Sequence, residues 1–137
     1  MTLRELLSDG KKFLEENDIY DGDLISKMIA EYIIKLDRSK LIIYNDMEID
    51  SVKCLEYKEM LNKIVSGVPV QYITNNQEFM KLNFYVDENV LIPQPDTELI
   101  VEEVIDYYHS QGCKILDLCT GSGAIGVSLA KYIEKSN

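Results

Sequence analysis

The stretch Leu116–Gly126, with the sequence LDLCTGSGAIG, constrains the fold of this chain more than any other. An apolar run ends beside an acid, a glycine-rich turn follows, and the next segment places Ile125, Leu129 and Ile133 on one side of a helix. This order predicts a buried strand over Lys114–Cys119, then a turn, then a helix. Strand, turn and helix in succession are typical of the first elements of a doubly wound α/β domain.

The residues before this stretch extend the α/β pattern in the N-terminal direction. A helix is predicted over 95–110, capped by Asp96 or Thr97, and its apolar face is assigned to four side chains, Leu99, Ile100, Val104 and Tyr107. A doubly wound sheet needs several strands, and only one is recognisable in 96–137. We therefore expect 96–137 to be the start of a truncated domain of this type.

Residues 1–66 have a helical pattern throughout. Thr2 and Glu5 have the spacing of a capping box, and apolar residues recur at helical intervals over 24–36. SKLIIYND, at 39–46, predicts a short helix or a strand. A further helix is predicted over Ser51–Ser66 and ends at Gly67, with its inward side assigned to Leu55, Leu61, Ile64 and Val65. These segments predict a small helical bundle that serves as a scaffold or a docking domain.

Residues 67–95 are punctuated by glycine, asparagine and proline, and they separate the bundle from the α/β segment. Within them EFMKLNFYVD carries aromatic and β-branched residues on both sides of a polar break at Lys81, which predicts a short hairpin. The fold class expected for the whole chain is α+β: a helical bundle over 1–66, a hairpin linker over 67–95 and an incomplete Rossmann-like domain over 96–137.

Composition and net charge weigh against several function classes. The net charge of −10, without a cluster of Lys and Arg, argues against direct binding to nucleic acid. No apolar run is long enough to span a membrane. Cys54, Cys113 and Cys119 form no metal-ligand spacing, so no metal is expected, and their odd number fits reduced thiols in a cytoplasmic protein.

Gly121, Gly123 and Gly126 satisfy G-x-G-x-x-G between the predicted strand and helix, where backbone N–H groups attract an anion. A P-loop would need a Lys after its last glycine, and none is present. A dinucleotide fits the glycine spacing, but the carboxylate of Asp117 would lie beside its pyrophosphate. S-adenosylmethionine has no phosphate and carries an ammonium as well as a carboxylate. An acid followed by glycines therefore favours S-adenosylmethionine, while a turn that binds nothing is the structural alternative.

LDLCTGSGAI, together with PVQYIT, EFM and VLIPQPDTE, resembles the HemK/PrmC family. These are class I methyltransferases that methylate N5 of the glutamine in the Gly-Gly-Gln motif of peptide chain release factors. The resemblance implies a release factor as protein substrate and S-adenosyl-L-methionine as cofactor. Together with the glycine pattern, it assigns cofactor binding to six residues: Asp117, Cys119, Thr120, Gly121, Ser122 and Gly123.

IPQPDTE adds a second candidate region, which is a wall of the pocket or a rigid start of the helix. Its possible wall residues are Pro93, Gln94, Thr97 and Glu98. Gln94 stands where the family usually has Arg and cannot supply that charge. Cys119 and Asn75 each replace a glycine that is common in the family.

The resemblance also shows what these 137 residues lack. The family grips the substrate amide with an Asn-Pro-Pro-Tyr motif, which is absent here, so we expect no catalytic residue in this chain and no activity from it alone. Two alternatives stay open: a nucleic-acid amino-methyltransferase, which shares this motif, and a helical adaptor without catalysis. The lone histidine, His109, is expected to interact with a helix end.

Overall fold

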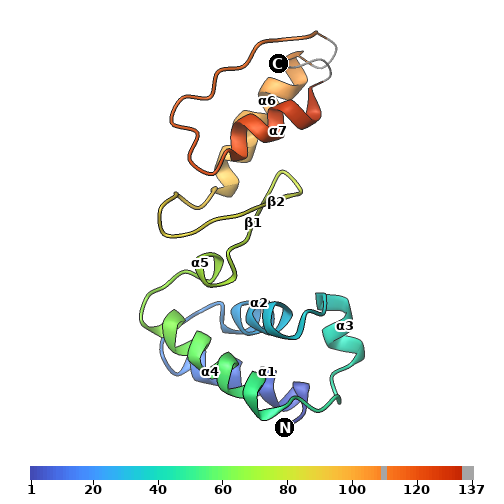
Figure 1. Ribbon diagram of the computed structural model, residues 1–137, viewed down its shortest axis with the longest axis vertical. Coiled ribbons are helices and arrows are strands. Elements are labelled where there is room, and N and C mark those ends of the chain that lie inside the picture. The colour runs from blue at the N-terminus through green and yellow to red at the C-terminus, as the bar shows by residue number, and fades with distance from the viewer. Residues whose placement is uncertain (109–110, 134–137) are drawn as a thin grey trace. The chain divides into compact units, whose positions relative to one another are not determined.

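The computed structural model describes residues 1–108 and 111–133, so the prediction for His109 lies outside the described residues. The chain divides into two compact units, Met1–Thr74 and Asn75–Asn137. Unit 1 is helical, and unit 2 pairs a two-stranded antiparallel sheet with two helices (Figure 1). The chain is thus of mixed α+β type. None of the helices within the described ranges is long and apolar enough to cross a membrane.

Unit 1 contains five helices in the order that Figure 1 labels: α1 Leu3–Glu15, α2 Gly22–Ile34, α3 Arg38–Ile43, α4 Ser51–Val65 and α5 Val70–Thr74. The predicted capping box is confirmed, because the Glu5 amide donates to the Thr2 hydroxyl while the Glu5 carboxylate accepts from the Thr2 amide. Asp37 and Asp50 cap α3 and α4 by accepting amides three residues on. SKLIIYND therefore contributes to a helix, and α5 is a short helix that the sequence did not predict.

The core of unit 1 forms where α1, α2 and α4 pack together. Its fully buried side chains include Leu3, Leu14, Ile29, Leu41 and Tyr57. Each buried aliphatic or aromatic side chain contributes roughly 1.5–3 kcal/mol to the stability of the fold. Within α4 the prediction was half right: Leu61 and Ile64 are buried, whereas Leu55 and Val65 are exposed. Tyr57 faces the core instead.

Tyr57 fits between α1 and α2 because α1 has a glycine opposite it. A Cβ atom on Gly10 would overlap the Tyr57 hydroxyl and lie 2.8 Å from its Cζ. The hydroxyl lies 2.6 Å from Ser26 Oγ and also faces the Ser26 carbonyl, so its buried oxygen has polar partners. Burial raises the pKa of Tyr57 to about 12. The ring therefore acts as a neutral, hydrogen-bonded part of the core.

Unit 2 opens with the predicted hairpin. Strands β1 (Gln77–Phe79) and β2 (Leu82–Phe84) pair antiparallel, and a two-residue turn, Met80–Lys81, joins them. Phe79 and Phe84 point from the hairpin into a core that also contains Val101, Ala124, Leu129 and Ile133. The two helices of this unit, α6 (Pro95–Tyr108) and α7 (Ala124–Tyr132), pack against each other. The predicted inward side of α7 is confirmed.

The predicted apolar face of α6 is wrong for three of its four residues, and only Val104 packs against the core. Leu99, Ile100 and Tyr107 are exposed, while Val101 is fully buried and Val104, Ile105 and Tyr108 pack against the same core. These four residues also have helical spacing, so both stripes satisfy the 3.6-residue period. The hairpin and α7 cover only the second stripe.

The predicted buried strand at Lys114–Cys119 is also a misprediction: residues 112–117 form neither helix nor strand and belong to no sheet. Cys113 and Ile115 are half-buried, whereas Leu116 and Leu118 are 81% and 75% exposed. A strand is defined by hydrogen bonds to a neighbour, and in the part of the chain that the structure describes no other strand pairs with this segment. The segment therefore has the alternating burial of a strand but no neighbouring strand to pair with.

Candidate functional site

The glycine turn is built from three residues in the left-handed backbone region. Cys119, Gly121 and Gly123 have φ values of +62°, +56° and +80°. Glycine adopts this conformation freely, whereas a side chain such as that of Cys119 clashes with its own backbone at a cost of about 1–2 kcal/mol. Asn75, the other residue that replaces a glycine common in the resembled family, is also left-handed, at +52°. Both substitutions thus stand where the backbone favours glycine.

The side chain of Asp117 links the glycine turn to the first turn of α7. Its Oδ2 accepts the hydroxyl of Thr120 at 2.9 Å and the amide of Gly126 at 3.0 Å. Gly126 is the third residue of α7, and the residue at the N-cap, Gly123, has no side chain with which to cap the helix. The carboxylate of Asp117 therefore supplies the missing cap from nine residues upstream.

Gly126 is a glycine because this carboxylate lies against it. A Cβ on Gly126 would lie 3.1 Å from Asp117 Oδ2 and 3.4 Å from Asp117 Cβ. Gly126 belongs to the glycine pattern of the sequence but was not among the predicted cofactor-binding residues. The third glycine of G-x-G-x-x-G was the signal that could have found it.

Two amides and one carboxylate oxygen beside the turn have no hydrogen-bond partner among the described residues. Within residues 1–108 and 111–133 the amides of Ala124 and Ile125 donate no hydrogen bond, and Asp117 Oδ1 accepts none. The first turn of α7 thus presents free N–H groups and the positive end of a helix dipole close to an anionic oxygen. Around Gly121 an added Cβ would meet only the Cys119 carbonyl, at 4.0 Å, so the backbone there is accessible.

The structure places the possible wall residues in another local arrangement. The side chain of Gln94 donates from Nε2 to the carbonyl of Ile92. The backbone carbonyl of Gln94 accepts the Thr97 amide at the start of α6. Pro93 precedes this start by two residues. Glu98 accepts the amide of Met80 in the hairpin turn at 2.6 Å. In the described ranges no hydrogen bond joins 93–98 to 117–123, so the two sets of candidate residues are not directly connected.

Comparison with known proteins gives matches over both units. Residues 5–74 match the family model described as the PrmC N-terminal domain. A protein of Clostridium acetobutylicum named "Release factor glutamine methyltransferase" is 39% identical over 135 residues, which cover 96% of this chain and 47% of that protein. Proteins of the same name from Flavobacterium psychrophilum and Moorella thermoacetica are 37% and 33% identical, over 80% and 99% of this chain and 40% and 48% of their own lengths.

The chain spans about half the length of the curated relatives it matches. The similarity runs through the helical unit and also through the glycine turn, since the alignment to the Moorella protein covers 99% of the chain. The family model itself covers about half of the chain. The chain therefore belongs to the PrmC family.

Proposed function

We propose that the protein takes part in the S-adenosylmethionine-dependent N5-methylation of the glutamine in the Gly-Gly-Gln motif of peptide chain release factors. The relatives are named for this modification, and their similarity extends over the glycine turn. The observation that carries the proposal is the position of Asp117. One of its carboxylate oxygens accepts no hydrogen bond from the described residues and lies beside the N-terminus of α7.

The residues of the turn fit the methionine end of S-adenosylmethionine. The free amides of Ala124 and Ile125 suit a carboxylate, and the open oxygen of Asp117 suits an ammonium group. A dinucleotide would instead bring a doubly charged pyrophosphate against Asp117, which Coulomb repulsion opposes. The remaining proposed residues, Thr120, Ser122 and the glycines, form the backbone of the same turn, and Thr120 also orients the carboxylate.

When bound, S-adenosylmethionine supplies a methyl group activated by its sulfonium. The contribution of the chain is binding and orientation: the glycine turn admits the ligand, the helix end neutralises its carboxylate, and Asp117 holds its ammonium. The amide nitrogen of glutamine is a poor nucleophile, so a second set of groups must position it. The Asn-Pro-Pro-Tyr motif that the family uses is absent from these 137 residues. We therefore propose that this chain alone does not transfer a methyl group, and methylation of a purified Gly-Gly-Gln protein by it would contradict this.

We further propose that 1–66 docks the release factor, that 67–95 links the two parts, and that 96–137 begins a class I, Rossmann-like domain. The burial pattern of the segment before the turn supports the last assignment. Its Ile115 side packs on unit 2, while Leu116 and Leu118 face away and leave one side of a strand uncovered. The cytoplasm is the proposed compartment, in keeping with three free cysteines.

The experiment that tests the cofactor is a titration followed by two-dimensional NMR of the ¹⁵N-labelled chain. We expect millimolar S-adenosylmethionine to shift the amides of Gly121, Gly123 and Ala124, while NAD at the same concentration leaves them in place. The affinity is expected to be weak, so calorimetry should detect no micromolar binding. Equal shifts with both ligands would favour a general anion site and contradict the proposal.

One observation favours the adaptor as a second candidate. Between α1 and α4 lies a hollow of about 300 Å³ with mostly apolar walls that include Leu6, Phe13, Tyr57 and Leu61. Capture of a release factor by the full chain, lost on Phe13→Asp and retained on Asp117→Ala, would assign docking to this hollow without any cofactor. Binding to nucleic acid is the less favoured alternative, and a gel-shift assay with the full chain checks it.

A further inference from the structure

The turn between β1 and β2 has a backbone conformation that its residues do not favour. Met80 and Lys81 have φ values of +51° and +58°. Two-residue hairpin turns of this kind are usually formed by Asn-Gly or Asp-Gly, because other side chains clash in the left-handed region. Neither Met nor Lys stabilises this conformation by itself. The turn must therefore be held by contacts from elsewhere.

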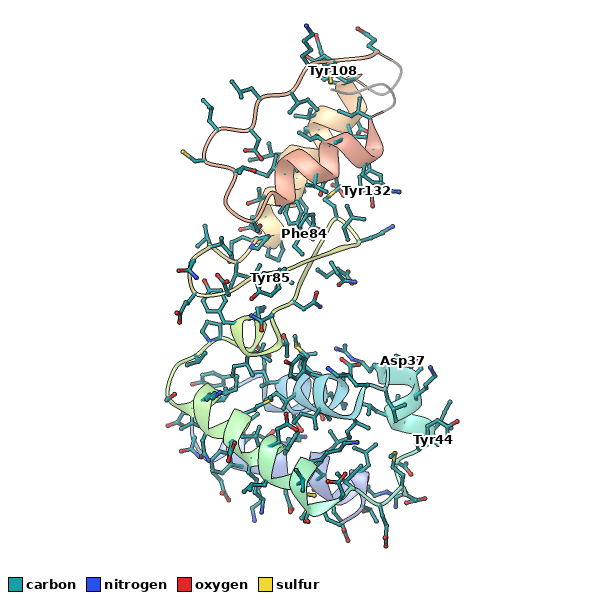
Figure 2. All side chains as sticks on the ribbon, viewed as in Figure 1. Asp37, Tyr44, Phe84, Tyr85, Tyr108 and Tyr132 are labelled. Atoms are coloured by element: carbon teal, nitrogen blue, oxygen red, sulfur yellow. The ribbon has the colours of Figure 1, made fainter. Side chains whose placement is uncertain are left out.

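Two side chains supply those contacts, and both bind the same residue. Glu98 Oε1, in the first turn of α6, accepts the Met80 amide at 2.6 Å. Tyr132 Oη, in the last residue of α7, donates to the Met80 carbonyl at 2.6 Å. Figure 2 labels Tyr132, which lies on α7 on the side of the hairpin tip. The N–H and C=O of one strained residue are thus fixed by two helices that are far apart in sequence. We name Glu98, Met80 and Tyr132 the turn clamp.

Glu98 is one of several carboxylates near the hairpin turn, but it alone among those of the described residues accepts the Met80 amide. Four carboxylates, Glu78, Glu98, Glu102 and Asp106, line a hollow of about 680 Å³ beside the turn, together with Lys81 and Tyr132. Among the hydrogen bonds of the described residues only that of Glu98 reaches the Met80 amide. Glu102 lies one helical turn further along the same helix, so it offers a carboxylate of the same kind without the contact.

We propose that Glu98 and Tyr132 are positioning residues for the glycine turn. α7 begins next to Gly123 and ends at Tyr132, so the turn clamp fixes the far end of the helix whose first turn carries the free amides. Nine residues span only about 14 Å, and a displacement at Tyr132 is transmitted along a short rigid helix to the Asp117–Gly126 hydrogen bond. α7 is thereby held at both ends. The role in ligand binding rests on the proposed function, whereas the mechanical coupling does not.

Amide hydrogen exchange of the full chain, measured by NMR without ligand, tests this coupling. A hydrogen bond to a charged group is worth enough that its loss should accelerate exchange of the Met80 amide roughly tenfold or more in Glu98→Ala. The Gly126 amide, at the other end of α7, should also exchange severalfold faster. Glu98→Gln should keep wild-type rates at both positions, because its amide oxygen still accepts. Glu102→Ala is the matched control and should change neither.

A further variant removes the contact to the Met80 carbonyl instead of the contact to its amide. Tyr132→Phe removes only the hydroxyl, and we expect faster exchange of the Gly126 amide, while Tyr107→Phe, on exposed α6 surface, leaves it unchanged. The amide of Ile29 in unit 1 serves as the internal reference for global unfolding. If Glu98→Ala unfolds unit 2, then Tyr132→Phe decides alone: faster exchange of the Gly126 amide supports the proposal, and an unchanged rate overturns it.

Two results would overturn the proposal. An unchanged Met80 rate in Glu98→Ala means that the contact does not hold the turn. A faster Met80 rate with an unchanged Gly126 rate, in both Glu98→Ala and Tyr132→Phe, means that the turn clamp is local and does not position α7. Because no ligand is present, failure of cofactor binding in a separate titration would bear on the proposed function only.

Discussion

The carboxylate of Asp117 lies 3.0 Å from the amide nitrogen of Gly126 and caps α7 in place of a side chain at the N-cap. Asp117→Ala should therefore destabilise α7 by about 1 kcal/mol, the usual effect of losing a cap. Asp117→Asn should cost much less, since its amide oxygen can accept the same N–H. The rate of amide hydrogen exchange at Leu129 measures both. Equal losses in the two variants would show that charge, and not the hydrogen bond, holds the helix.

Two non-glycine residues with positive φ should respond in opposite directions to glycine. Cys119→Gly should raise the free energy of unfolding of unit 2 by about 1 kcal/mol, because it removes a steric clash in the left-handed region. Asn75→Gly should lower it, since asparagine tolerates this region and its Nδ2 donates to the Val86 carbonyl at 3.0 Å. Urea denaturation monitored by NMR gives both values. A stabilising Asn75→Gly would contradict this account.

The two buried serines offer a second matched pair. Ser128 is fully buried, and its hydroxyl has no hydrogen-bond partner in the part of the chain that the structure describes. Ser128→Ala should raise stability by about 1 kcal/mol because a buried unsatisfied group is removed. Ser26 lies 2.6 Å from the Tyr57 hydroxyl and donates to the Leu7 carbonyl. Ser26→Ala should therefore lower stability by about 1–2 kcal/mol. Thermal unfolding that gives both variants the same sign would refute the assignment of partners.

The capping box of α1 should give the stability a dependence on pH. The amide of Thr2, followed by its hydroxyl, lowers the pKa of Glu5 from its ordinary value of 4.5. A lowered pKa in the folded state means that the stabilisation is fully present above pH 4.5 and is lost as the pH falls below it. Glu5→Gln should be less stable than the wild type at neutral pH, and the difference in melting temperature should shrink as the pH falls below 4.5. A difference that stays constant with pH would contradict a role for the carboxylate charge.

Local signals in the sequence predicted much of the fold. The spacing of Thr2 and Glu5 identified the start of α1, Gly67 identified the end of α4, and Lys81 lies in the turn of the hairpin. Each of these features depends on residues a few positions apart, whose geometry the sequence specifies directly.

The features that the sequence did not predict depend on packing between distant segments. Val101 and Leu99 lie on stripes of equal period on α6, and only the position of the hairpin and α7 selects the first. Leu116 and Leu118 alternate as in a strand, but a strand also needs a partner to pair with. Hydrogen bonds such as that between Tyr132 and Met80, 52 residues apart, leave no periodic trace in the sequence.

The same division applies to the candidate site. The turn residues from Asp117 to Gly123 lie together because they are neighbours in sequence, and the glycine pattern was sufficient to predict a turn there. The reasons for Gly126 and Glu98 came only from the structure, which places a carboxylate against the first and a hairpin amide against the second.

The central claim is that the negative charge of Asp117 selects the ligand of the glycine turn, beyond its role as a helix cap. The most direct test is an NMR titration of the wild type and Asp117→Asn with S-adenosylmethionine. Our account predicts that the Gly121 and Gly123 amides of the wild type shift on titration. In Asp117→Asn these shifts should be lost, while the Gly126 amide keeps its slow exchange. Equal shifts in an equally well-folded Asp117→Asn would contradict the claim.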